Sequence, residues 1–365
     1  MNSPFRRNAA LQNGMLPVDI VLGPAWWHRH EGITFDEDYF FHPARRVEVE
    51  RRMEQALYDR WGRFGLGADH HTNLPVAGAV HLAAGFLIAE MLGCTVRYSE
   101  AKPPEVVPAN AATLRLEPER AFASPAFERL RKLVDALEAR CGYVVGDVNF
   151  GGILNHALDV RGQTILMDLM DRPDEAAGFF AALAEVQDRF TTFIERRTGS
   201  SSISVNRTLR HIPKPVYLHS ECSHVMISTN DYERFLLPFD AEWSRRRRPF
   251  GIHYCGADPH RYAESFAKVP HLDFLDVGWP GDLRTLRRHL PDTFLNIRYS
   301  PVEIAKQTPD EIRRTVRRLV HDSACPYLTG VCCINMDDQV TDDQVAALFE
   351  EVEQLRGEYA AQENP

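Results

Sequence analysis

Three short apolar segments decide the fold of this chain: PFGIHYC (residues 249–255), LDFLDV (272–277) and TFLNIR (293–298). Each has the length of a strand, and each is followed by a segment with a helical pattern. A further strand predicted at 326–334 leads to a last helix, with Thr341 as its N-cap and Gln344 three residues on. Strands that alternate with helices at spacings of about 25 to 35 residues are typical of βαβ units in a parallel sheet.

The alternation extends toward the N-terminus. Further strands are predicted at 17–23, 143–150 and 215–220, and helices at 44–62, 78–93, 163–196, 258–268, 282–290 and from Ser124-Pro125 onward. Two more helices are predicted by their caps, one from about 229 with Ser228 and Asp231, and one after Thr308-Pro309 with Glu311. Residues 100–123 are rich in Pro and Ala and predict an irregular segment. Because no unit carries the glycine fingerprint of a dinucleotide-binding fold, the pattern favours a (β/α)8 TIM barrel of the α/β class, with an N-terminal helical extension. We expect a single domain over residues 1–365.

Composition narrows the class of partner. The chain has 365 residues and a formal net charge of −9, which argues against nucleic acid as a partner because phosphate binding needs clustered Lys and Arg. Its seven cysteines are odd in number and irregularly spaced, so a reducing compartment is favoured over a disulfide framework. We see no apolar run with the length of a signal peptide or a membrane span, and we expect a cytoplasmic protein with no membrane partner. The sequence leaves the oligomeric state open, a homodimer included.

His253 and Cys255 form the most informative pair. Residues two apart on a strand share a face, so both side chains would project together at a strand end, where a barrel places its active site. Imidazole nitrogen and thiolate sulfur are the ligands that zinc prefers. A third ligand is predicted from the last strand, either Cys332 or Cys333, because adjacent residues face opposite ways. Glu221, after the strand at 215–220, is a candidate fourth ligand. Three ligands with an exchangeable fourth position are typical of catalytic zinc.

Two thiolates on zinc suit a particular chemistry. They soften the Lewis acid, so such a site is poor at activating water but can bind a substrate thiol as a thiolate that attacks a methyl group. The plainer alternative stays open, because a buried Cys is often a small hydrophobic residue and a lone His a satisfied polar group.

Other strand ends suggest substrate contacts. Trp26, Trp27 and His28 follow the first strand and could form an aromatic cage, with ordinary packing as the alternative. Asp147 and Asn149 end the strand at 143–150, and Asp147 is also a candidate catalytic acid or base. Asp276 lies near another strand end, as a further substrate contact or as a loop residue.

Three stretches resemble a known family. They are ALDVRGQTILMDLMDRPDEAAGFFAAL (157–183), ECSHVMISTNDYERFLLPF (221–239) and FGIHYCG (250–256). They are similar to the uroporphyrinogen decarboxylase superfamily, in particular to zinc-dependent corrinoid methyltransferases such as the methylcobalamin:coenzyme M enzymes. The resemblance is best over residues 141–357, whereas residues 1–140 form an N-terminal part with divergent substrate loops.

The resemblance implies a (β/α)8 barrel and a zinc site. It carries over the zinc ligands to His253, Cys255 and Cys332, with Cys333 as the alternate, and it places Glu221 at the family's acidic position as a catalytic residue. It also implies a corrinoid, methylcobalamin, as co-substrate. Because the Asp-x-His-x-x-Gly signature of corrinoid binding is absent from the chain, the corrinoid would come on a separate small carrier protein.

One departure limits the function. Decarboxylases of the superfamily carry an Arg-Gln-Ala-Gly-Arg-Tyr stretch near the N-terminus, where this chain has AWWHRHEG (25–32). We therefore expect a zinc methyltransferase that moves a methyl group between a corrinoid and a small thiol or methylated substrate. The alternatives are a metal-free decarboxylase or lyase that uses Asp147 or Glu221, and a non-catalytic zinc- or corrinoid-binding protein.

Overall fold

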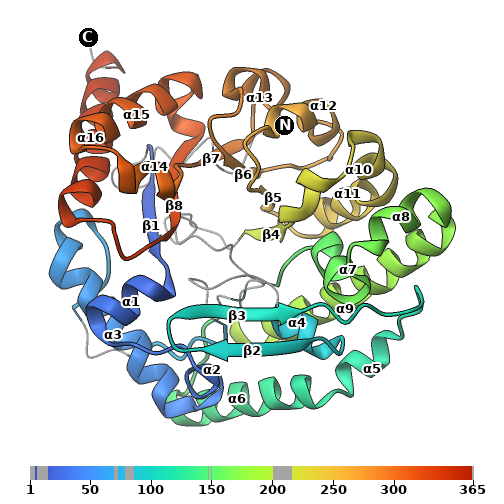
Figure 1. Cartoon of the computed structure of the whole chain (residues 1–365). Coiled ribbons are helices and arrows are strands. Elements are labelled where there is room, and N and C mark those ends of the chain that lie inside the picture. Colours follow the sequence, from blue (N-terminus) through green and yellow to red (C-terminus); the bar gives the residue numbers. More distant parts are fainter. Residues whose placement is uncertain are drawn as a thin grey trace.

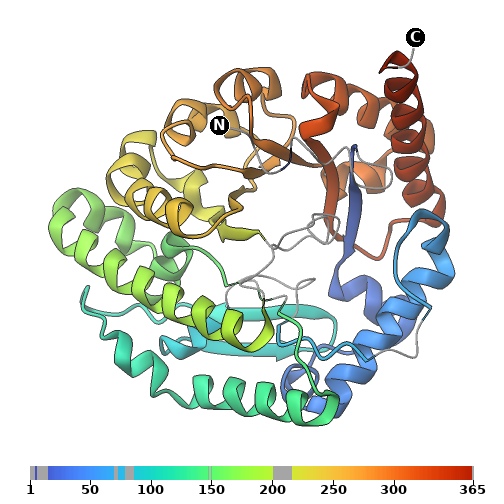
Figure 2. The same cartoon turned by 180° about the vertical axis from the view of Figure 1, so that it is seen from behind.

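A six-stranded parallel sheet forms the centre of the molecule. The computed structural model describes residue 5 and residues 15–69, 73–78, 86–146, 148, 150–199 and 216–363. The strands run in the order β1-β8-β7-β6-β5-β4. Their bounds are β1 Val18–Leu22, β4 Tyr217–Ser220, β5 Phe250–Tyr254, β6 Phe274–Gly278, β7 Phe294–Arg298 and β8 Thr329–Met336. Figures 1 and 2 show the sheet curled, with helices around its outer side, which confirms the TIM-barrel-like α/β class.

The N-terminal half closes the other side of the ring. A parallel bridge joins Val76 to Val145, and a two-stranded antiparallel hairpin, β2 and β3, lies opposite the main sheet (Figure 1). The elements of this half are α1 Pro24–Glu31, α2 Glu37–Phe41, α3 Pro43–Trp61, α4 Phe86–Met91, β2 Thr95–Ser99, β3 Lys102–Val107, α5 Pro118–Phe122, α6 Pro125–Cys141, α7 Ile153–Arg161, α8 Thr164–Asp171 and α9 Pro173–Thr198.

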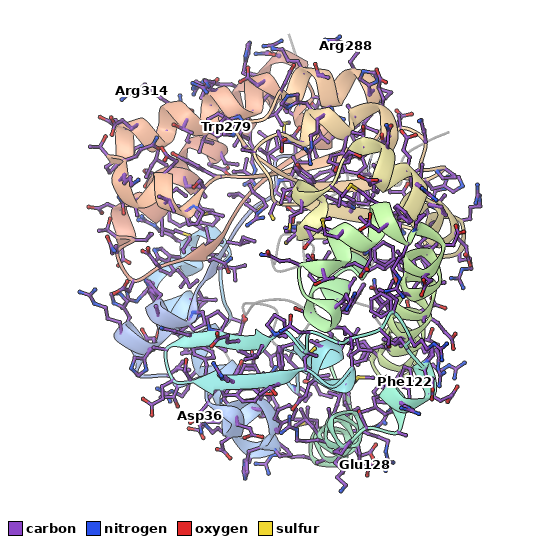
Figure 3. All side chains as sticks on the ribbon, turned by 45° about the vertical axis from the view of Figure 1, so that its right-hand side comes forward. Asp36, Phe122, Glu128, Trp279, Arg288 and Arg314 are labelled. Atoms are coloured by element: carbon purple, nitrogen blue, oxygen red, sulfur yellow. The ribbon has the colours of Figure 1, made fainter. Side chains whose placement is uncertain are left out.

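Helices of the C-terminal half follow the strands in the predicted order. They are α10 Thr229–Phe235, α11 Leu237–Arg246, α12 Ala263–Phe266, α13 Leu283–His289, α14 Pro301–Lys306, α15 Pro309–Asp322 and α16 Asp342–Glu363, with short 3-10 turns that include Gly62–Phe64, Cys222–Met226, Pro259–Tyr262 and Pro326–Leu328. Charged side chains such as Arg288 and Arg314 point outward from this helical layer (Figure 3). No helix within the described residues has the length and apolar character of a membrane span.

Several predicted helix starts are confirmed by their caps. Ser124 accepts a hydrogen bond from the Phe127 N–H, and capping boxes join Ser228 to Asp231 and Thr308 to Glu311. At the start of α16, the Thr341 N–H donates to the Gln344 side chain and the Gln344 N–H donates to the Thr341 hydroxyl oxygen. Each cap satisfies backbone N–H groups that the first turn leaves without helical partners.

Three predictions about elements were wrong in detail. The segment 100–123 is not irregular, since it holds β3 and α5. The single helix expected at 163–196 is two, α8 and α9, because Pro173 cannot continue a helix and Arg172 before it leaves the helical region. In the described part of 143–150, strand pairing is limited to the bridge at Val145.

The parallel register stacks the interior of the sheet in layers. Leu218, Gly251, Phe274 and Phe294 pair across neighbouring strands, and two residues further on Ser220, His253, Asp276 and Asn296 pair in the same way. Residues two apart share a face, so both rows look into the barrel. We call them the apolar layer (Leu218, Phe274 and Phe294) and the polar layer (Ser220, His253, Asp276 and Asn296).

Two hydrophobic clusters reflect this division. The apolar layer packs against Phe5, whose ring centroid lies 5.4 Å from that of Phe294, in a small cluster separate from the main core. The main core fills the space between the sheet and the helices. The interior is thus closed by apolar side chains at the N-terminal ends of the strands, and functional side chains lie toward their C-terminal ends, as the barrel fold predicts.

The outer core makes a testable contribution to stability. Ile312 on α15 is fully buried, so we expect Ile312→Ala to lower the free energy of unfolding by about 2–5 kcal/mol, through lost burial and the cavity left behind. Val302 on α14 is 53% exposed, and Val302→Ala is the control, with a change within about 0.5 kcal/mol. Denaturant titration of both variants measures this, and equal losses would contradict the assigned core.

Candidate metal centre and active site

His253 lies at the middle of the polar layer and is oriented by Asp276. Its Nδ1 donates to an Asp276 carboxylate oxygen at 2.5 Å, and both side chains are buried. Burial alone would lower the pKa of His253, but the neighbouring Asp276 carboxylate outweighs it and raises the pKa. Because Nδ1 is committed to Asp276, Nε2 is the nitrogen left to bind a metal, the arrangement common for histidine ligands.

Asp276 is itself held in place. Asn296 donates its Nδ2 to the other Asp276 oxygen at 3.2 Å, and Cys332 Sγ lies 3.7 Å from that same oxygen. The carboxylate therefore has contacts on both oxygens and cannot rotate away from His253 without losing them. Asp276, predicted as a substrate contact or loop residue, lies in the structure as the partner of His253.

Cys222 and Cys255 lie beside His253 at the mouth of the barrel. Ligand atoms of the three residues lie within 4.8 Å of one another, a spacing that could hold one metal ion among the described residues. The two thiols share a hydrogen bond that lowers the pKa of Cys255 to about 4 and raises that of Cys222 well above its ordinary value. A metal cation that binds both sulfurs would displace the thiol proton.

Arg298 neighbours both Cys332 and His253. Cys332 pairs with Arg298 in the register of β7 and β8, and Arg298 Nη1 lies 3.4 Å from His253 Nε2. Cys332 is buried and lies against Asp276 and Asn296. In the described part of the chain Cys332 is outside the three-residue cluster, and its role as a ligand stays a prediction.

Cys333 faces the other way. It is fully buried in the main core between sheet and helices, and burial raises the pKa of its thiol. Adjacent strand residues point to opposite faces, so the structure separates the two alternatives that the sequence left open. Cys333 has no access to the interior of the sheet.

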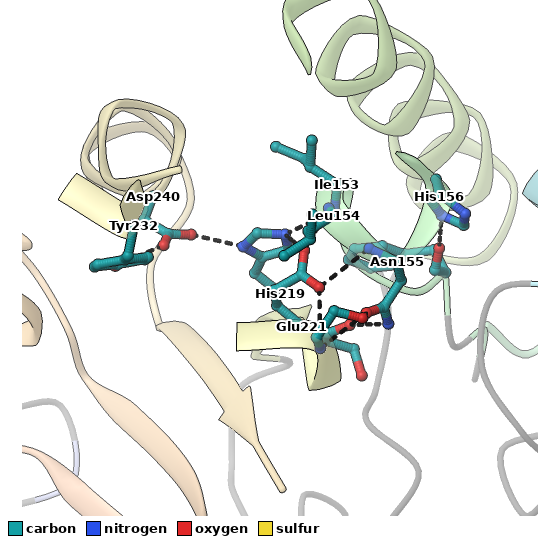
Figure 4. Close-up of polar contacts among 11 residues, drawn as sticks. Ile153, Leu154, Asn155, His156, His219, Glu221, Tyr232 and Asp240 are labelled. Carbon is teal, nitrogen blue, oxygen red and sulfur yellow. Dashed lines mark hydrogen bonds and ion pairs between the residues drawn. The ribbon is translucent and has the colours of Figure 1, made fainter. Parts of the chain in front are cut away.

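Glu221 points away from the metal candidates. Its carboxylate accepts hydrogen bonds from the backbone N–H groups of Leu154 at 2.7 Å and Asn155 at 3.2 Å, at the N-terminus of α7 (Figure 4). A Cβ on Gly152 would lie 2.4 Å from Glu221 Oε2, so glycine there leaves the room that the carboxylate occupies. Burial raises the pKa of Glu221 to about 7, against the lowering effect of His219.

A buried chain of polar groups backs Glu221. His219 Nε2 lies 3.7 Å from Glu221, and its Nδ1 lies 2.7 Å from Asp240, which also accepts from the Tyr232 hydroxyl at 2.8 Å (Figure 4). This chain joins β4, α7, α10 and α11. Since Glu221 precedes Cys222 directly, these contacts fix the backbone that presents the Cys222 thiol.

The predicted aromatic cage is a packing cluster. Trp26 and Trp27 are buried on α1, with ring centroids 5.0 Å apart, and Trp26 also packs against Trp61 of α3. His28 Nδ1 lies 3.3 Å from the Ile33 carbonyl. No contact joins these side chains to the metal candidates among the described residues. Asp147 and Asn149 lie outside the described residues.

Sequence reasoning missed Cys222 and Arg298. A signal for both existed, because each lies two residues beyond a polar-layer residue, Ser220 and Asn296 respectively, just as Cys255 lies two beyond His253. Asp240 and Tyr232, which lie on helices, gave no such signal.

Comparison with known proteins rests on structure. No protein-family model matches the chain, and no curated protein matches it in sequence. A methyltransferase from Methanosarcina mazei superposes with a TM-score of 0.66 at 12% identity, over 99% of each chain.

A second solved structure is a B12-independent methionine synthase from Shewanella sp. W3-18-1 in complex with selenomethionine. It superposes with a TM-score of 0.50 at 10% identity, over 93% of this chain and 98% of that one. These likenesses confirm the fold that the resemblance to the uroporphyrinogen decarboxylase superfamily implied.

Asp276 gives a first test of the site. Asp276→Asn removes the charged acceptor of His253 Nδ1, so we expect zinc to bind about 10- to 100-fold more weakly. Competition with a chromophoric chelator measures the affinity. Asp310→Asn, at a side chain 79% exposed, is the control and should leave it unchanged. An Asp276→Asn variant with wild-type affinity would contradict the assigned role.

Cys222 gives a second test. We expect Cys222→Ser to weaken zinc binding at least about tenfold, because a thiolate ligand is lost, while Cys141→Ser on α6 has no effect. The same chelator assay applies, with Cys332→Ser alongside. Zinc affinity that survives in Cys222→Ser but is lost in Cys332→Ser would contradict the geometric assignment and favour the ligand set implied by the family resemblance.

Proposed function

We propose that this protein is a zinc-dependent methyltransferase of the uroporphyrinogen decarboxylase-like superfamily. In this proposal it moves a methyl group between a corrinoid on a separate carrier protein and a small thiol or methylated substrate. The observation that supports the proposal most is the cluster of Cys222, His253 and Cys255 at the C-terminal ends of adjacent barrel strands. A cytoplasmic setting, where these thiols stay reduced, suits such a site.

The donor set fits zinc better than a hard cation. Two sulfurs and one imidazole nitrogen are soft ligands, and a site of this composition with one open position is typical of catalytic zinc. Magnesium and calcium would instead need several carboxylate or carbonyl oxygens. When bound, zinc would hold a substrate thiol as a nucleophilic thiolate at neutral pH.

The chain's own residues prepare this chemistry. Asp276 holds His253 in the tautomer whose Nε2 can bind the metal, and the polar chain behind Glu221 fixes Cys222. Cys255 is exposed at the mouth, which leaves a path for substrate. Val225 and Met226, each 44% exposed, follow Cys222 closely and offer apolar surface to a carrier protein.

The methyl donor in this proposal comes from the sequence motifs. One structural neighbour is named only as a methyltransferase, and the other is described as B12-independent. Corrinoid dependence therefore rests on the resemblance of the sequence motifs to the corrinoid methyltransferases. A folate or another methylated compound as donor would keep the same zinc and thiol chemistry.

The geometry gives less support to a metal-free decarboxylase. Glu221, its candidate acid or base, is fully buried, and its oxygens accept from backbone N–H groups. A carboxylate bound in this way is better placed to fix Cys222 than to exchange protons with a substrate. The other alternative, a zinc-binding protein without turnover, is an outcome of the experiment below.

The proposal predicts a zinc-dependent reaction of methylcobalamin. Anaerobic, zinc-loaded protein with methylcobalamin and a panel of small thiols should show loss of methylcobalamin absorbance and an S-methyl product by mass spectrometry. His253→Ala should abolish both, because a metal ligand is lost, whereas His321→Ala, at a side chain 71% exposed, should leave both unchanged.

Other outcomes separate the alternatives. Zinc binding without turnover with any methyl donor would favour the non-catalytic protein. Turnover that persists after chelation and in His253→Ala would contradict a zinc enzyme.

A further inference from the structure

Cys222 and Cys255 are a pair of thiols whose redox chemistry the proposed function does not use. Their sulfur atoms lie within 4.8 Å of each other, and Cys255 Sγ lies 3.9 Å from the Cys222 carbonyl oxygen. Each cysteine lies two residues beyond a partner in the register of β4 and β5, Ser220 and His253 respectively. Because a disulfide joins sulfurs at about 2.0 Å, rotation of the two side chains toward each other would bring them within bonding distance.

The two segments that carry these sulfurs are already held together. Cys222 begins a 3-10 turn, and the carbonyl oxygens of His224 and Ile227 lie in this turn and directly after it. Both oxygens accept hydrogen bonds from the chain that follows the second thiol, from the Tyr262 hydroxyl at 2.7 and 2.8 Å and from Arg261 Nη2 at 2.9 and 3.0 Å. A covalent bond between the thiols would therefore join parts of the backbone that already lie side by side.

The two thiols differ in their access to solvent. All seven cysteines lie among the described residues, and Cys255 is the exposed one, whereas Cys222 is half-buried. Cys332 and Cys333 are fully buried, and Cys325 packs on the apolar cluster at the opposite ends of the strands. Redox-sensitive cysteines are accessible to solvent and lie next to a second thiol. Cys255 is thus the thiol that an oxidant reaches first, and Cys222 is placed to react with it next.

We propose that Cys222 and Cys255 form a reversible disulfide when the protein meets a peroxide, and that this bond excludes the metal. The Cys255 sulfur attacks hydrogen peroxide, so that an S–O bond forms, the O–O bond breaks and hydroxide leaves, which gives a sulfenic acid. The Cys222 sulfur then attacks the Cys255 sulfur, the S–O bond breaks, and the oxygen leaves as water with the remaining thiol proton. In total, two thiols are oxidised to one disulfide and one peroxide is reduced to two waters.

The disulfide would remove two of the three candidate metal ligands. His253 would remain, and a single imidazole nitrogen is far short of the ligand set that zinc needs. Metal and disulfide therefore exclude each other, because bound metal occupies the sulfurs and oxidised sulfurs cannot bind metal. The bond itself depends on the geometry of the thiols, whereas its effect as a switch on methyl transfer rests on the proposed function.

Thiol mapping of the full-length protein tests the proposal. Reduced, metal-free protein is treated with hydrogen peroxide, alkylated with iodoacetamide and digested for mass spectrometry. We expect the peptides of Cys222 and Cys255 to be joined and their thiols to escape alkylation, with both effects reversed by dithiothreitol. Cys141→Ser is the control and should give the same joined pair. Two thiols that stay alkylatable, or a disulfide between other cysteines, would overturn the proposal.

A variant tests the order of the two steps. In Cys222→Ser the sulfenic acid of Cys255 has no thiol beside it, so we expect dimedone to label Cys255 at least about tenfold more strongly than in the wild type. Equal labelling of Cys255 in both proteins would contradict the role of Cys222 in the second step. The mapping of the wild type needs no variant and stands if Cys222→Ser does not fold.

Zinc measurements keep the disulfide separate from the proposed function. In the chelator assay, oxidised protein should bind zinc at least about a hundredfold more weakly than reduced protein, because two ligands are lost. If the reduced protein binds no zinc, the proposed function fails, while a mapped disulfide still supports the thiol pair. An oxidised protein that binds zinc as tightly as the reduced one would overturn the exclusion of metal.

Discussion

The parallel register of β4 to β8 is the constraint on which the rest of the structure depends. Because side chains alternate along a strand and parallel partners face the same side, a residue's function follows from its place in the register. Apolar residues close the interior near the start of each strand. Two residues further along the strands, on the same face of the sheet, lie His253 and Asp276. Another two residues along lie Cys255 and Arg298. A one-residue shift of any strand would turn its polar residues into the core.

Charge explains why these residues belong together. A divalent ion held by the thiolates of Cys222 and Cys255 would form a neutral unit, and Asp276 and Arg298 would lie beside it with opposite charges. Asp276 acts on His253 by direct contact, and the charge of Arg298 contributes from a distance to the lowered pKa of Cys255. Outside this site, Glu221 and its polar chain join β4 to three helices and hold the loop that carries Cys222. The groups that would bind a ligand thus depend on groups that never touch it.

Much of the fold could be predicted from the sequence, because local signals carry it. Strand-length apolar runs and capping boxes at Ser228 and Thr308 predicted the C-terminal half almost element by element. The N-terminal half was harder. In the β2–β3 hairpin, β3 contains two prolines and little alternation, and the pairing is a property of the two strands together. Trp26 and Trp27, which resembled a cage in sequence, serve the packing of α1 on α3.

The candidate site could be predicted only in part, for a similar reason. The His253–Cys255 spacing is local and was visible, and the parity rule correctly limited the last strand to one inward cysteine. The position of Cys222 depends on where the chain goes after β4, and Arg298 depends on the side-by-side order of β7 and β8. Neither is encoded in spacing along the chain. Asp276 was noticed as a strand-end residue, but its partner became known only through the register of β5 and β6.

X-ray absorption at the zinc edge of the loaded, full-length protein would test the central claim most directly. The account predicts two or three sulfur neighbours at about 2.3 Å and at least one nitrogen at about 2.0–2.1 Å, with one sulfur lost in Cys222→Ser. A shell of oxygen and nitrogen alone, or a spectrum unchanged in Cys222→Ser, would contradict the assignment of Cys222, His253 and Cys255 as the metal centre.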